Sequence, residues 1–301
     1  MIGDVYKRQG HDSLTIEYGL HAIGAALGSV LSDPEDDATA IIQHVAKDLD
    51  DLSCLDLEKV RRKNHPWFQM NYDACQIALE KVGDEVAVGV TIPGPITAAA
   101  SICQTDVLLR GMIKKKEQVH QLIRFCTDAI KQVFGEFMEL PIGFSLCDPI
   151  ASSTILRPSQ YDEFCLPYTQ EIFDFLHERN NGACYHVCGD TTAITKNLVD
   201  TGCDTLSLDN KVDLEFAKKE VGDRITIIGN LDANEYVYLG NRESIFAGVK
   251  ECFRKCWDNP CGYIFATGCD IPKEAPLENL DAMMDAARYY GKWPLKAENF
   301  E

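Results

Sequence analysis

One strand and the helix that follows it stand out in residues 183–200, which read ACYHVCGDTTAITKNLVD. Residues 183–187 form a short apolar run of the kind that makes a buried strand. A glycine-containing turn comes next, and residues 192–200 have the pattern of a helix. A buried strand followed at once by a helix predicts a parallel sheet whose strands are joined by helical crossovers.

The same alternation extends over the chain beyond Pro141. The predicted strands are 142–147, 183–187, 205–208, 225–229 and 263–267, with 28–31 and 85–90 as two more in the first half. The predicted helices are 159–179, 192–200, 214–221, 242–256 and 277–290. In the last helix, Leu277, Leu280, Met284 and Ala287 share one face, which predicts that this face packs against the core.

Seven predicted strands, with room for an eighth upstream, favour one (β/α)8 TIM barrel over two domains. Residues 11–301 contain no Ser/Gly-rich linker and no internal repeat, so we expect them to form a single barrel domain. Residues 1–10 are polar and lack periodicity, and we interpret them as a non-structural, artefactual start. We therefore expect a barrel that lacks part of its N-terminal region.

Charge and cysteine content limit the classes of partner. The 301 residues carry a formal net charge of −18, which argues against nucleic acid and against an anionic membrane surface, because both require clustered Lys and Arg. The longest apolar region, 86–103, is interrupted by Pro93 and Pro95, so we expect no membrane span. Thirteen cysteines without regular spacing indicate reduced thiols and a cytoplasmic protein.

His186, Cys188 and Cys269 have the spacing of an open zinc site. Residues i and i+2 of a strand face the same way, so His186 and Cys188 can bind one ion, and Cys269 follows a later predicted strand. Three protein ligands leave the fourth tetrahedral position free, as in catalytic zinc sites. The alternative is that these are buried cysteines that fall near a histidine by chance, since free cysteine often behaves as a small hydrophobe.

Other polar residues also follow the predicted strands, where a barrel has its active site. They are Asp148, Asp190, Asp209, Asn230, Asp232 and Asp270. Asp, Asn and Gly also favour such turns for backbone reasons. Asp190 with Thr191 or Thr192 can therefore simply cap the next helix.

Several of these runs resemble the uroporphyrinogen decarboxylase superfamily, and within it the cobamide-dependent branch of methylcobamide:coenzyme M methyltransferases and their bacterial relatives. The runs are HVCGDT at 186–191, GCD at 202–204, LD at 208–209, GNLD at 229–232, GCDIP at 268–272 and PLEN at 276–279. The His-x-Cys pair with a distant Gly-Cys is the discriminating part, because members of that branch use these residues as zinc ligands and the decarboxylases do not.

The resemblance implies a zinc-dependent enzyme that moves a methyl group from a methylcobamide, carried by a partner corrinoid protein, to a small thiol that zinc activates. Asp148, Asp190 and Asp270 are then candidates for orienting the ligands or acting in catalysis, and Asn230 and Asp209 for binding the cofactor. Three alternatives stay open: transfer from a methyl donor to the corrinoid, metal-free decarboxylation of a porphyrinogen, and a scaffold that binds metal without turnover.

Overall fold

The computed structural model describes residues 12–32 and 39–300, so the prediction for residues 1–10 lies outside the described residues. The described chain forms two compact units that interleave in sequence. The amino-terminal unit comprises residues 12–151 and 155–183, and the carboxyl-terminal unit comprises residues 152–154 and the chain from residue 184 onward.

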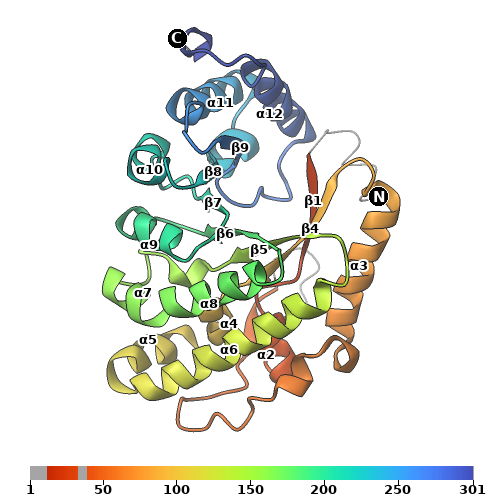
Figure 1. The fold of residues 1–301 in the computed structure, drawn as a ribbon, viewed down its shortest axis with the longest axis vertical. Coiled ribbons are helices and arrows are strands. Elements are labelled where there is room, and N and C mark those ends of the chain that lie inside the picture. The colour runs from red at the N-terminus through yellow and green to blue at the C-terminus, as the bar shows by residue number, and fades with distance from the viewer. Residues whose placement is uncertain (1–11, 33–38, 301) are drawn as a thin grey trace. The chain divides into compact units, whose positions relative to one another are not determined.

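The amino-terminal unit contains three parallel strands in the order β1-β4-β5. They are β1 (Ser13–Glu17), β4 (Ala87–Pro93) and β5 (Gly143–Cys147). Its helices are α2 (Ala22–Leu27), α3 (Pro66–Val82), α4 (Pro95–Ile102), α5 (Thr105–Lys114), α6 (Lys116–Phe137), α7 (Pro158–Phe164) and α8 (Leu166–His177), with short helices η1 (Leu57–Val60), η2 (Arg62–Asn64) and η3 (Pro149–Ala151). All eight residues of α4 are buried, and α4 packs against α2 and α6, so it forms the centre of this unit (Figure 1).

The carboxyl-terminal unit contains four parallel strands in the order β6-β7-β8-β9. They are β6 (Ala183–Val187), β7 (Thr205–Leu208), β8 (Thr226–Leu231) and β9 (Tyr263–Thr267). Its helices are α9 (Thr195–Asp200), α10 (Leu214–Val221), α11 (Arg242–Cys256) and α12 (Leu277–Tyr290), with short helices η4 (Thr192–Ile194), η5 (Ala233–Tyr238) and η6 (Ala297–Phe300). Figure 1 shows α11 and α12 packed side by side, and each helix follows a strand as in βα units.

Strand β6 has two different faces, and this difference positions the functional residues. Tyr185 and Val187 are buried on one face, at 0 % and 1 % exposure, while Cys184 and His186 are half-buried on the other. The alternation is the period of two that a strand imposes on its side chains. Apolar packing therefore anchors one face of β6 and leaves the other for chemistry.

Five predicted strands are confirmed as β5 to β9, and the prediction for 85–90 corresponds to β4. The prediction of one helix over 159–179 is wrong, because the structure has α7 and α8 separated at Cys165. Pro167 is the second residue of α8, and a proline lacks the N–H that a continuous helix would need there. In the part of the chain that the structure describes, no helix has both the length and the apolar character required to span a membrane.

Two further predictions are corrected. Within 28–31, only Val30–Leu31 is a strand, and as β2 it pairs in an antiparallel manner with β3 (Ile41–Gln43), apart from the parallel strands. The buried face of α12 is formed by Asn279, Ala282, Met283 and Ala286. Leu277 is 67 % exposed, so the predicted stripe lies at the edge of the packed face rather than at its centre.

Asp148 links the end of β5 to the start of α4. Its Oδ1 accepts a hydrogen bond of 2.9 Å from the backbone N–H of Thr97, in the first turn of α4, and the side chain is fully buried. A Cβ at Gly94 would lie 2.2 Å from Asp148 Cγ, so the approach requires glycine. Burial raises the pKa of the Asp148 carboxyl from 3.8 to about 7, although its bonds to Thr97 oppose the shift.

This raised pKa predicts a pH-dependent stability. The folded state holds the Asp148 proton more tightly than the unfolded state, so the contribution of Asp148 is full below pH 3.8 and is lost as the pH rises through about 7. Asp148→Asn cannot ionise, so we expect the variant to gain stability relative to the wild-type protein between pH 5 and pH 8. The gain should be on the order of 2–4 kcal/mol, measured by denaturant unfolding.

Asp84→Asn is the control, since Asp84 is exposed. The free energy of unfolding of Asp84→Asn should differ from that of the wild-type protein by the same amount at every pH between 5 and 8. A pH-independent difference between Asp148→Asn and the wild-type protein would contradict the prediction.

Candidate metal centre

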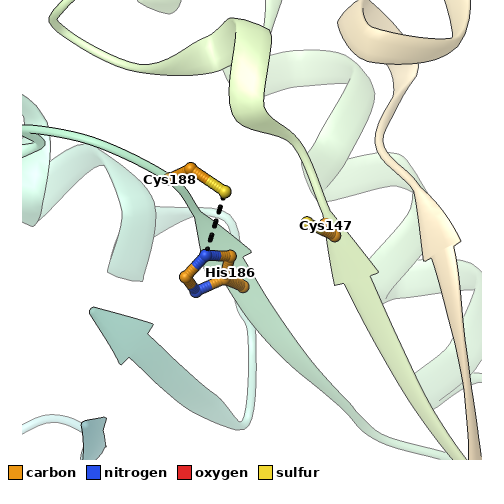
Figure 2. A group of neighbouring side chains, drawn as sticks. All are labelled: Cys147, His186 and Cys188. Carbon is orange, nitrogen blue, oxygen red and sulfur yellow. Dashed lines mark hydrogen bonds between the residues drawn. The ribbon is translucent and has the colours of Figure 1, made fainter. Parts of the chain in front are cut away.

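His186 and Cys188 lie together at the carboxyl end of β6. His186 is the fourth residue of the strand and Cys188 directly follows its last residue, so both side chains project from the half-buried face. The Nε2 atom of His186 is 3.2 Å from the Sγ atom of Cys188, as the dashed line in Figure 2 shows. Figure 2 also labels Cys147, the last residue of β5, which belongs to the amino-terminal unit.

Cys269 comes from the loop that follows β9, two residues beyond the end of that strand. Its thiol donates to the Sγ atom of Cys188 over 3.8 Å. The preceding Gly268 donates its N–H to the carbonyl of Leu231 over 2.8 Å, and a Cβ there would lie 2.4 Å from the backbone N of Asn210. A glycine at 268 therefore lets the loop approach the ends of β7 and β8 closely enough for Cys269 to reach Cys188.

Two of the three separations between these donor atoms are close to those around a tetrahedral zinc ion. With zinc–sulfur bonds of about 2.3 Å and zinc–nitrogen bonds of about 2.0 Å, tetrahedral angles place two sulfur ligands about 3.8 Å apart and a sulfur and a nitrogen about 3.5 Å apart. The Cys188–Cys269 separation of 3.8 Å matches the first value, and the His186–Cys188 separation of 3.2 Å is slightly shorter than the second. One imidazole and two thiols are also the soft donor set that zinc prefers.

Without a bound cation, the surroundings of Cys269 favour the neutral form of its thiol. The hydrogen bond with Cys188 is the largest cause that raises the pKa of Cys269, and burial adds to it, while a bond with His186 acts in the opposite direction. A divalent cation reverses this balance, because a coordinating thiol loses its proton outright. All three side chains are half-buried, so a ligand from solvent can reach them.

The turn after Cys188 is fixed by contacts from two sides. Gly189 has a φ of +82° and donates its N–H to Asp209 Oδ2 over 2.8 Å. On the other side, Ser152 donates its hydroxyl to the Asp190 carbonyl, and the Asp190 N–H donates to Thr154 Oγ1, both over 3.2 Å. The backbone that carries Cys188 is therefore held independently of the cysteine itself.

The three aspartates predicted to act in catalysis lie in different surroundings. Asp190 is exposed, and its Oδ1 accepts the N–H of Thr192 over 2.9 Å in an i,i+2 turn contact, while the N-cap of the following η4 is Thr191. Asp270 is also exposed, and its backbone N–H bonds to the sulfur of Cys269. Asp148 lies in the amino-terminal unit, where it binds α4. Their catalytic roles stay predictions.

Asp209 and Asn230, the predicted cofactor-binding residues, are both buried and engaged with the backbone. Asp209 Oδ1 accepts the N–H of Lys211 over 2.9 Å, in addition to its bond from Gly189. Asn230 Nδ2 donates to the carbonyls of Asp209 and Val212 over 3.0 Å and 2.7 Å. These bonds favour a role in holding the loops around the site, and contact with a cofactor stays a prediction.

Ser207 is a site residue that the sequence analysis does not identify. Its hydroxyl lies 3.0 Å from the Nδ1 atom of His186, on the opposite side of the ring from Cys188. The sequence does contain an indication of Ser207, because it precedes Asp209 by two residues and an extended chain places both side chains on one face.

Comparisons with known proteins extend over nearly the whole chain. A family model described as uroporphyrinogen decarboxylase (URO-D) matches residues 3–290. The methylcobamide:CoM methyltransferase MtbA of Methanosarcina acetivorans is 29% identical over 278 residues, which cover 92% of this chain and 78% of the relative. The methylcobamide:CoM methyltransferase MtaA of Methanosarcina barkeri is 26% identical over 291 residues, covering 95% and 82%.

A solved structure has the same fold. The structure described as a methyltransferase from Methanosarcina mazei aligns with a TM-score of 0.84 at 23% sequence identity, covering 95% of this chain and 83% of that one. Together with the parallel strands and their following helices, this likeness confirms the predicted α/β fold of the TIM-barrel class.

The turn at Gly189 yields a stability prediction. Gly189→Ala would strain the backbone at a φ of +82° and bring the new Cβ to 2.9 Å from Ser152 Oγ and 3.0 Å from Thr154 Oγ1. We expect the free energy of unfolding to fall by about 1–3 kcal/mol, measured by urea denaturation.

The control is Gly135→Ala, a helical position where the nearest atom is Phe175 Cζ at 3.9 Å. That variant should be neutral or more stable by up to about 1 kcal/mol. A Gly189→Ala protein as stable as the wild type would show that the turn is not constrained as described.

Proposed function

The chain belongs to the uroporphyrinogen decarboxylase family, and we propose that within this family it is a cobamide-dependent methyltransferase with a zinc ion on His186, Cys188 and Cys269. The observation that carries the proposal is the position of Cys188, whose sulfur lies 3.2 Å from His186 Nε2 and 3.8 Å from Cys269 Sγ. Similarity to the methylcobamide:CoM methyltransferases supports the reaction class.

The ligand set suits activation of a thiol. Two cysteine thiolates and a neutral imidazole would balance the charge of a zinc ion, and three protein ligands leave one tetrahedral position for a substrate. Bound there, zinc would supply a lower thiol pKa, so that the acceptor sulfur is a thiolate near neutral pH. We therefore propose a small thiol as the acceptor, in keeping with the coenzyme M in the relatives' names.

The net reaction we propose moves a methyl group from a corrinoid to this sulfur. The S–C bond forms as the Co–C bond breaks, the electron pair of the broken bond stays on cobalt, and the thiol proton is released to solvent. Because the chain would receive its methyl group on a corrinoid, a corrinoid protein is the proposed partner. We also propose a cytoplasmic location, because all thirteen cysteines are free thiols, which a reducing compartment preserves.

The residues of the chain would divide this work between binding and orientation. His186, Cys188 and Cys269 would hold the metal, and the hydrogen bond at His186 Nδ1 would orient the ring. Asp209, with Ser152 and Thr154, would keep the turn at Gly189 and Asp190 in place beside Cys188.

Metal analysis of ligand variants tests this proposal. We expect about one zinc ion per chain in the wild-type protein by plasma mass spectrometry. Cys188→Ala and Cys269→Ala should each lose zinc, and methyl transfer from methylcobalamin to a panel of small thiols should fall by roughly two orders of magnitude or more.

Cys261→Ala is the matched control, because Cys261 is an exposed free cysteine in the same unit. It should keep both zinc and activity. A folded wild-type protein without zinc, or full methyl transfer by a zinc-free variant, would contradict the proposal. A metal-free protein that decarboxylates a porphyrinogen would favour the decarboxylase alternative.

A further inference from the structure

Strand β7 runs beside β6 in a register that pairs the two strands residue by residue. Cys184 is the partner of Thr205, and His186 is the partner of Ser207. In parallel neighbours with this register, paired side chains project from the same face. The side chain of Ser207 is therefore directed along the imidazole of His186, and its Oγ lies 3.0 Å from Nδ1.

The two nitrogens of His186 face different partners. Nε2 is 3.2 Å from the sulfur of Cys188, on the candidate metal side, and Nδ1 faces the hydroxyl of Ser207. If Nδ1 carries the proton and donates it to Ser207 Oγ, the lone pair of Nε2 is free to bind a metal. A fixed partner at Nδ1 thus selects both the tautomer and the ring orientation.

The contact from Ser207 is separate from the contacts that hold the backbone. Asp209 binds the N–H of Gly189 over 2.8 Å, and its own position is fixed by the N–H of Lys211. Asn230 adds a bond to the Asp209 carbonyl. Removing the Ser207 hydroxyl therefore leaves the turn after Cys188 in place and affects the imidazole alone.

We propose that Ser207 is a positioning residue that sets the tautomer and orientation of His186 for metal binding. This inference rests on the proposed function, since it requires His186 to be a ligand. Removing the hydrogen-bond partner of a metal-bound histidine typically weakens metal binding by 10-fold to 100-fold. The effect is therefore measurable without any assay of activity.

The test compares three variants on the full chain. Ser207→Ala removes the hydroxyl, and Ser207→Thr retains it. Thr205→Ala is the matched control, because Thr205 lies two residues before Ser207 on the same face and bonds to Cys184, which is not a proposed ligand. Zinc affinity is measured by competition with a chelator, and the absorption spectrum of the cobalt(II)-substituted protein reports the ligand geometry.

We expect Ser207→Ala to bind zinc about 10-fold to 100-fold more weakly and to shift the cobalt(II) spectrum. Ser207→Thr should keep the zinc affinity and the cobalt(II) spectrum close to those of the wild-type protein, and Thr205→Ala should match the wild-type protein. Wild-type affinity and spectrum in Ser207→Ala, or an equal loss in Thr205→Ala, would overturn the inference while leaving the zinc proposal intact. A wild-type protein that binds no zinc would overturn the proposed function, and this inference with it.

Discussion

The parallel register of β6 with β7 is the constraint on which the candidate site depends. It sets His186 beside Ser207, and the alternation of side chains along β6 then puts Cys188 on the face of His186. A slip of one residue would turn His186 into the layer occupied by Tyr185 and Val187, away from Cys269. The pairing of β8 with β9 brings the loop that carries Cys269 to the same end of the sheet. The geometry of the candidate site is thus a consequence of strand pairing.

The carboxylates and the soft ligands at these strand ends make different contacts. Asp148, Asp190, Asp209 and Asp232 each accept backbone N–H groups from a turn or the first turn of a helix. Such bonds satisfy donors that a helix leaves free at its start. The histidine and the two cysteines instead contact one another. These carboxylates therefore hold the backbone at the strand ends, and an imidazole and two thiols are the soft donors there, a set that favours zinc over the harder cations.

The sequence predicts most of this arrangement, and its failures have physical causes. β6, β7 and β9 have their predicted bounds, because each is a short run with buried apolar residues that ends at a polar turn. The sequence analysis does not predict β1, because its residues alternate between exposed and half-buried and form no apolar run. The face of α12 is mispredicted because periodicity gives a stripe but not which neighbour covers it. The spacing of Ser207 to Asp209 indicates the face of Ser207, but its contact with His186 depends on the register between two strands, which neither strand's sequence contains.

X-ray absorption at the zinc edge of the purified protein would identify the ligands, because it reports the atoms around the metal. We expect two sulfur neighbours at about 2.3 Å and a nitrogen neighbour at about 2.0 Å, with a third sulfur appearing when a small thiol is added. Replacement of Cys269 by alanine should remove one sulfur from any zinc that remains. Zinc surrounded only by nitrogen and oxygen, or a sulfur count that does not respond to thiol, would contradict a site built on His186, Cys188 and Cys269.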